Sequence, residues 1–283
     1  MPELPEVETT TRGLQKEVLG LKITDIWTDL NTGDKRKNDT VANPKFFKVF
    51  KKGVIGTKII SAERRAKNIL INLSNKKTIL VHMKMTGYLF YGSNPNIKYA
   101  HVRFSFSNKK FLVFSDARKF GKITLLDTKT AHDSKHLKHL GPEPLAKSFS
   151  LKRFIERLKR KPNSKIKTTL MDQTIIAGIG NIYSDEILWA SDIHPERKVG
   201  QIKEKEFLKM YKNMQRILTK GIHFGGDSMS DYLNIYGLPG KFQLHHNVYQ
   251  RKGEKCKKKN CKGIIERKMI NSRSAHFCSK HQV

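Results

Sequence analysis

The sequence predicts an α+β protein with a sheet-rich N-terminal domain, a helical second domain and a compact metal-binding tail. Short β-type segments fill the first half of the chain, helical spacing of apolar residues follows, and all three cysteines fall in the last 28 residues. A hydrophobic content of 37% is enough for packed cores and excludes a disordered basic protein. We expect domains over 1–140 and 147–283, a linker over 141–146 and a zinc-finger hairpin over 247–283.

The first expected element is a helix over residues 6–19. Val7, Leu14 and Val18 fall on one helical face, and Pro5 suits a first helical turn. The β-type segments that follow combine β-branched and aromatic residues with period-two alternation. Strands are therefore expected around 23–27, 59–62, 69–73 and 79–83 and in the stretch 101–115, where residues 107–110 would turn a hairpin.

The sequence pattern changes from β-type to helical at the expected domain boundary. Gly141, Pro142 and Pro144 interrupt regular secondary structure there. Helical patterns then continue to about residue 222. Within them a Gly-x-Gly turn precedes a helix that begins near Asn181, and the free N–H groups of that helix end would face a phosphate. Plain helix packing explains the same glycines, so both interpretations stay open.

The charge is strongly basic. Lys and Arg number 56 against 25 Asp and Glu, a formal charge of +31. Such an excess releases counterions from a polyanion and predicts nucleic-acid binding, although a ribosome-associated protein would share it. No apolar run approaches a membrane span, and the acidic start MPELPEVETT lacks a signal core. We expect a protein that stays inside the cell and does not bind membranes.

The tail has the pattern C-x4-C-x16-C-x2-H. Four soft or borderline ligands in two close pairs suit a tetrahedral zinc ion, and a closed shell of four protein ligands is structural rather than catalytic. The alternative is that these residues stay without a metal. A segment this small and polar cannot bury a core, so metal binding would supply its folding energy. The expected ligands are Cys256, Cys261, Cys278 and His281.

Several motifs together resemble the formamidopyrimidine-DNA glycosylase family, in the group that includes endonuclease VIII. PELPEVET, RRAKN, HMKMTG, DARKFG, IKTTLMDQ, GIGNIY, GGDSMSDY and the cysteine tail occur in the family order and cover essentially the whole chain. The resemblance implies a β-sandwich-like N-terminal domain with a flanking helix, followed by a helix-two-turns-helix region and a zinc-finger hairpin. The opening PELPEVE favours the branch that acts on oxidised purines such as 8-oxoguanine and formamidopyrimidines.

The resemblance also implies a bifunctional DNA glycosylase and AP lyase of base excision repair. After removal of Met1, the amine of Pro2 would attack C1′ of an extruded nucleotide and form a Schiff base, and β,δ-elimination would follow. A free α-amine titrates below a lysine side chain, so more of it is nucleophilic near neutral pH. Glu3 would serve as the acid/base carboxylate and Glu6 would support it, although both also suit an ordinary acidic helix start.

Other motif positions carry family roles. Lys67 matches a lysine at the phosphate near the lesion, and Lys167 matches one implicated in damaged-purine processing, so both are assigned to catalysis. Residues 225–237 match a loop that covers an extruded purine. The expected partner is double-stranded DNA with a damaged base or abasic site, bound by a cytoplasmic monomer in a basic cleft between the domains. The expected DNA contacts are His82, Met85, Arg118, Phe120, Asn181, Tyr249, Arg267 and Arg273.

The chain departs from the family pattern in the tail and in IKTTLMD. The usual tail has Cys-x2-Cys pairs, whereas here the first spacer has four residues and His281 stands last. Thr168 and Thr169 stand where the family has a proline and a bulkier residue, so lesion preference can shift. Two other functions stay open at this point: an endonuclease VIII-like glycosylase for oxidised pyrimidines, and a noncatalytic basic zinc protein that binds nucleic acid.

Overall fold

The computed structural model describes residues 1–283 and divides into two compact units. The sheet unit comprises 1–138 and 224–241, and the helical unit comprises 139–223 and 242–283. The expected continuous second domain, 147–283, is therefore interrupted. The physical reason is that 224–241 bonds to the sheet unit, where the Tyr91 N–H donates to the Ile235 carbonyl at 2.7 Å.

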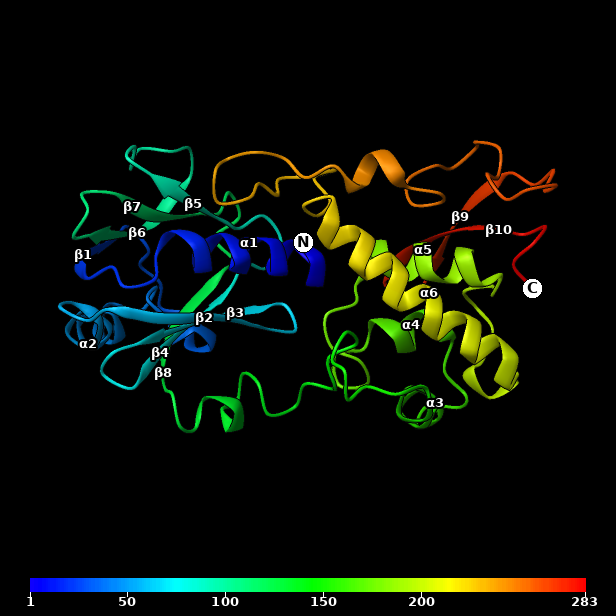
Figure 1. Cartoon of the computed structure of the whole chain (residues 1–283), viewed down its shortest axis with the longest axis horizontal. Coiled ribbons are helices and arrows are strands. Elements are labelled where there is room, and N and C mark those ends of the chain that lie inside the picture. The colour runs from blue at the N-terminus through cyan, green and yellow to red at the C-terminus, as the bar shows by residue number, and fades with distance from the viewer. The chain divides into compact units, whose positions relative to one another are not determined.

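Two four-stranded antiparallel sheets form the sheet unit (Figure 1). One has the order β1-β6-β7-β5 and the other β2-β3-β4-β8. Apolar residues of both sheets join a single buried cluster, which makes the unit a sandwich. The strands are β1 Ile23–Thr28, β2 Ile59–Arg65, β3 Asn68–Leu73, β4 Lys77–His82, β5 Tyr88–Gly92, β6 Ala100–Phe106, β7 Phe111–Ser115 and β8 Lys122–Asp127.

Helix α1, Leu4–Glu17, packs across β2 and β3. It begins two residues earlier than the expected helix because Glu3 already has extended backbone and caps it, which puts Leu4 and Pro5 in the first turn. Leu4, Val7 and Leu14 are fully buried, and each contributes about 1.5–3 kcal/mol by leaving water. The helix thereby fixes the N-terminus of the chain on the sandwich.

Helix α2, Pro44–Val54, was not among the expected elements. Its phenylalanines and valines favour strands as isolated residues, which conceals the helical spacing. Asn43 caps it, because the Asn43 Oδ1 accepts from the Phe46 N–H at 3.0 Å, and Pro44 fixes the first turn. The helix buries Phe50 and Val54 in the core of the sandwich.

The helical unit contains α3 Leu151–Lys159, α4 Ile166–Met171, α5 Asn181–Ser191 and α6 Glu204–His223, followed by the hairpin of β9 Ile265–Ile270 and β10 Arg273–Cys278. Figure 1 shows α6 crossing α5, and the two make the most extensive helix pair of the unit. Short 3-10 turns complete the structure at Lys35–Lys37, Ala131–Asp133, Val199–Gln201 and Phe242–His245. No helix has both the length and the apolar character that crossing a membrane requires.

Candidate functional site

The start of α1 gathers Pro2, Glu3 and Glu6. The Glu6 carboxylate accepts from the Glu3 backbone N–H at 2.7 Å and from the Asp227 N–H at 2.8 Å. It therefore joins the N-terminus to the loop that begins at residue 224. Glu3 and Glu6 are almost completely buried, at 2% and 1% exposure. A side chain on Gly226 would approach Glu6 Cγ to 2.9 Å, so glycine is required at that position.

A cluster of cations lies at one end of the sheet β2-β3-β4-β8. Asn68, His82 and Lys122 pair across adjacent strands, and Lys67 forms the β2–β3 turn with Ala66. Desolvation, followed by the charges of Lys84, Lys67 and Lys122, lowers the pKa of His82 to about 3. Because the Lys84 backbone N–H donates to His82 Nδ1 at 3.0 Å, the neutral ring carries its proton on Nε2. His82 is thus a neutral hydrogen-bond donor in a cationic site.

Two loops next to this sheet carry three of the predicted DNA contacts. Met85 lies in the β4–β5 loop, and Arg118 and Phe120 lie in the β7–β8 loop. The buried Asp116 joins these loops, because it accepts from the Thr86 hydroxyl and, at 2.6 Å, from the Gly121 N–H. Phe120 is 47% exposed, and the Arg118 guanidinium lies 4.6 Å from its ring centroid. An exposed aromatic residue on a braced loop can enter a base step.

Lys167 lies inside the helical unit with no exposed surface. Its ammonium donates to Asp185 Oδ1 at 2.6 Å, to the Ser184 hydroxyl at 3.2 Å and to the Asn181 carbonyl at 3.5 Å. These three bonds use all of its protons. The other oxygen of Asp185 accepts from the His276 backbone N–H at 3.0 Å and lies 3.1 Å from His276 Nδ1. The network joins α4, the first turn of α5 and strand β10.

Glu186, next along α5, organises the segment that carries Tyr249. Its buried carboxylate accepts from the backbone N–H groups of Asn247, Val248 and Tyr249 at 2.9–3.1 Å. Charge-assisted bonds of this kind hold a loop firmly. The predicted DNA contacts of the hairpin, Arg267 and Arg273, are exposed on β9 and β10.

The structure brings the four tail residues together as candidate metal ligands. Their ligand atoms all lie within 4.8 Å of one another. Cys261 Sγ lies 3.7 Å from Cys278 Sγ, and His281 Nδ1 lies 3.4 Å from Cys256 Sγ and 3.8 Å from Cys261 Sγ. Tetrahedral zinc with ordinary bond lengths requires about 3.8 Å between sulfurs and about 3.6 Å between sulfur and nitrogen. The cluster can hold a metal ion and is compatible with a zinc finger.

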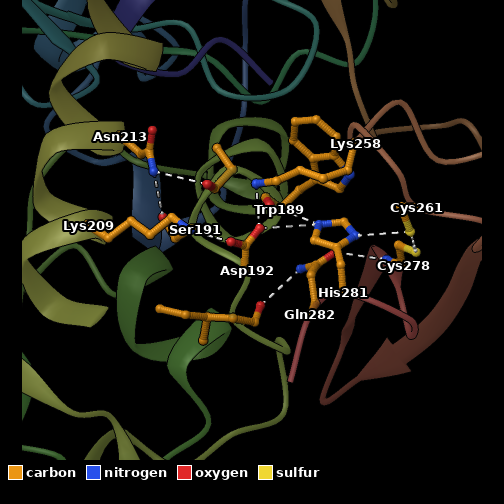
Figure 2. Close-up of polar contacts among 12 residues, drawn as sticks. Trp189, Ser191, Asp192, Lys209, Asn213, Lys258, Cys261, Cys278, His281 and Gln282 are labelled. Atoms are coloured by element: carbon orange, nitrogen blue, oxygen red, sulfur yellow. Dashed lines mark hydrogen bonds and ion pairs between the residues drawn. The ribbon is translucent and has the colours of Figure 1, made fainter. Parts of the chain in front are cut away.

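The far side of the His281 ring faces the C-terminal end of α5 (Figure 2). His281 Nε2 lies 3.2 Å from the Trp189 carbonyl oxygen and 3.7 Å from Asp192 Oδ1. Lys209 and Lys258 both donate to the Asp192 carboxylate. Burial raises the pKa of Asp192, but these two hydrogen bonds outweigh it and leave the pKa below its ordinary value. Asp192 is therefore a carboxylate at neutral pH.

Sequence reasoning missed the buried acids Asp116, Asp185 and Glu186 and the partly buried Asp192. Each orients a predicted functional segment, and none lies in a pattern that periodicity detects. The sequence carried a signal for Asp185 and Glu186. These two consecutive acids interrupt the otherwise apolar pattern of the helix NIYSDEILW. Charged residues on a helix that is buried on all sides are retained only with partners, so these positions indicated buried hydrogen-bond networks.

Comparisons with known proteins match both units. Residues 1–123 match the model of the formamidopyrimidine-DNA glycosylase N-terminal domain, and residues 140–232 match that of the formamidopyrimidine-DNA glycosylase H2TH domain. The formamidopyrimidine-DNA glycosylase of Pelotomaculum thermopropionicum is 38% identical over 98% of both chains. That of Streptococcus mutans is 38% identical over 100% of this chain and 99% of its own.

Solved structures agree with these sequence matches. A Lactococcus lactis Fpg bound to DNA that contains an abasic site superposes with a TM-score of 0.88, at 33% identity and 99% coverage of both chains. A MutM complex with DNA that contains carbocyclic 8-oxo-G gives a TM-score of 0.86, at 34% identity and 99% coverage of both. The similarity covers the predicted α+β architecture from end to end, which confirms the expected fold class.

Proposed function

The chain belongs to the formamidopyrimidine-DNA glycosylase family, and from this premise we propose how its residues divide the work of the enzyme. The protein is a base excision repair glycosylase for oxidised purines, and AP lyase activity is typical of its family. Its partner is DNA with a damaged base or an abasic site. We expect it to act as a monomer in the cytoplasm.

Pro2 is the proposed nucleophile. In this chain Met1 precedes it, so the nitrogen becomes an amine only when Met1 is removed. The amine then attacks C1′ as the glycosidic bond breaks, and the electron pair of that bond leaves with the base. Opening of the sugar ring produces a Schiff base. Loss of the C2′ proton with the 3′ oxygen, and then of the C4′ proton with the 5′ oxygen, cleaves the strand on both sides.

Glu3 is the proposed acid/base group, and Glu6 is a positioning residue. Opening of the sugar ring places a developing charge on O4′, which a carboxylic acid at the adjacent residue can protonate. Glu6 accepts from the backbone N–H of Glu3 and from that of Asp227. This arrangement supports a role in which Glu6 holds both the catalytic end of α1 and the loop proposed to cover the base.

The exposed and loop residues are proposed to bind DNA. An extruded nucleotide leaves a gap in the stack, which Met85, Arg118 and Phe120 would fill. Lys67 is proposed to act at the phosphate beside the lesion. His82, neutral and protonated on Nε2, would donate to a phosphate at any pH near neutrality. The proposed phosphate contacts of the helical unit are Asn181, Tyr249, Arg267 and Arg273.

Lys167 is proposed to act as a positioning residue rather than by touching the base. The sequence assigned it to catalysis, but its buried ammonium already donates three hydrogen bonds within the helical unit. One of them ends on Asn181, at the helix end proposed to bind phosphate. Removal of Lys167 would therefore disturb DNA binding through α5.

We propose one structural zinc ion in the Cys256, Cys261, Cys278 and His281 cluster. The distances between the ligand atoms carry this assignment. Zinc would supply the folding energy of the tail and take no part in the reaction.

Borohydride trapping tests the proposed function. Protein whose mass confirms that it begins at Pro2 is mixed with a duplex that contains 8-oxoguanine opposite cytosine, and the adduct is mapped by mass spectrometry. We expect a covalent complex at Pro2 that is absent from the matched control, the same protein with Met1 retained. Cleavage of thymine glycol in preference to 8-oxoguanine would contradict the purine assignment. Duplex binding without an adduct on either lesion would contradict the enzyme assignment.

A further inference from the structure

Two departures from the usual cysteine pattern lie beside the same carboxylate. His281 stands where the family has a fourth cysteine, and Lys258 lies in the lengthened spacer between Cys256 and Cys261. The Lys258 ammonium donates to Asp192 Oδ1, and His281 Nε2 lies 3.7 Å from that same oxygen. Figure 2 shows the three side chains converging at the end of α5.

We propose that Asp192 is a positioning residue for the metal site, holding His281 as a ligand through Nδ1 and docking the first cysteine knuckle on the end of α5. The inference rests on the proposed zinc. It explains the longer spacer and the histidine together. The carboxylate of Asp192, which is not itself a metal ligand, would hold both Lys258 of the spacer and the ligating imidazole of His281.

The contacts around His281 carry the argument. The Trp189 carbonyl accepts from Nε2 at 3.2 Å, which requires that nitrogen to keep its proton and leaves the lone pair of Nδ1 for a metal. The Trp189 ring meets the imidazole edge-on, with 5.6 Å between centroids. A carbonyl or carboxylate on the far nitrogen orients a ligating imidazole and raises its basicity. A cysteine in place of His281 would lack the ring that makes these contacts.

Asp192 also joins three elements of the helical unit. It follows α5 as the C-cap in a left-handed conformation with φ of 61°, and its carboxylate accepts from Lys209 of α6 and from Lys258 of the knuckle. Its carbonyl accepts from the Val283 N–H at 3.2 Å. The residue therefore fixes the tail to both helices, which is what a metal knuckle without an apolar core requires.

The test is the zinc affinity of Asp192→Asn, measured by competition with a chromogenic chelator after zinc content has been determined by atomic absorption. Asparagine tolerates the left-handed conformation, so the backbone is preserved. Loss of an outer-shell partner typically weakens metal binding 10–100-fold, and we expect at least about tenfold here. The matched control is Asp172→Asn, which breaks another Asp–Lys pair of the helical unit, with Lys161, and should keep the wild-type affinity.

The same change in a His281→Cys background separates a specific effect from general loosening. Four thiolates should retain zinc, and Asp192→Asn should then lower the affinity by a smaller factor than in the His281 protein, because the imidazole is gone and only the contact with Lys258 is lost. An equal loss in both backgrounds, an equal loss in Asp172→Asn, or no loss in Asp192→Asn would overturn the inference and leave the zinc proposal standing. A wild-type protein that binds no zinc would overturn both.

Discussion

The sheet unit and residues 242–283 differ in how much apolar side chain they bury. In the sheet unit, α1, α2 and both sheets contribute to one continuous apolar cluster. In 242–283 the buried hydrophobic side chains are few: Phe242, Val248, Ile265, Ile270, Ala275, Phe277 and two of the cysteines. The first region can fold by the hydrophobic effect, whereas the second requires other sources of stability.

Helix α5 provides those other sources. Asp185 and Glu186 on the helix, and Asp192 at its end, accept hydrogen bonds from β10, from the segment with Tyr249 and from the cysteine knuckle. The tail is thus fastened at three buried or partly buried carboxylates, and its four candidate metal ligands lie together. A strongly basic segment can therefore be ordered by a few acids that the rest of the protein holds in place.

Metal removal should produce the largest loss of stability. We expect that loss to be confined to the tail, residues 242–283. Structural zinc contributes roughly 10–16 kcal/mol of binding energy in small zinc domains. On chelation, we expect amides of β9 and β10 to lose protection from hydrogen exchange, while amides of β3 and β4 keep theirs. Added zinc should restore the hairpin. A hairpin that stays protected without metal would show that the three acids suffice.

A cavity in the sandwich should produce the next largest effect. Phe104 is 2% exposed in the apolar cluster, so Phe104→Ala should cost about 3–5 kcal/mol. Phe120→Ala is the matched control, because that ring is 47% exposed and its loss should change stability by less than about 0.5 kcal/mol. Urea unfolding monitored by circular dichroism measures both. Equal losses would mean that the loop of Phe120 contributes to the core.

Asp185→Asn should destabilise the helical unit by about 3 kcal/mol, because it leaves the Lys167 ammonium buried without its counter-charge. Combining it with Lys167→Met should restore part of that loss, since the uncompensated charge is gone. Asp172→Asn again serves as the control, with a half-exposed partner and an expected cost of about 0–1 kcal/mol. If the double variant were less stable than Asp185→Asn alone, Asp185 would stabilise the unit by more than neutralising the charge of Lys167.

The features that the sequence predicted correctly depend on residues close together in the chain, and the features that it missed depend on residues far apart. Apolar periodicity located α1 and most strands of the sandwich, and cysteine spacing located the candidate metal site, because each depends on local patterns. Strands β5 and β8 and helix α2 were not expected. The buried and partly buried acids were also missed, since a carboxylate such as Asp192 is recognised only when Lys209, Lys258 and His281, distant in sequence, meet around it. The 224–241 segment was assigned to the wrong unit for the same reason.

The smallest predicted effect concerns His82 and the pH dependence of the sheet unit. Its pKa is about 3 in the folded protein, below the ordinary 6.5, so protonation favours the unfolded state. The contribution to stability is complete above pH 6.5 and declines as the pH falls toward 3. Between pH 7.5 and 5.5 the loss should be about 1 kcal/mol, from protonation of the unfolded chain alone. His82→Asn should remove this part of the slope in urea unfolding at the two pH values. A variant whose slope equals that of the wild type would show that His82 binds protons equally in the folded and unfolded protein, and the lowered pKa that supports its proposed role as a neutral donor to phosphate would then fail.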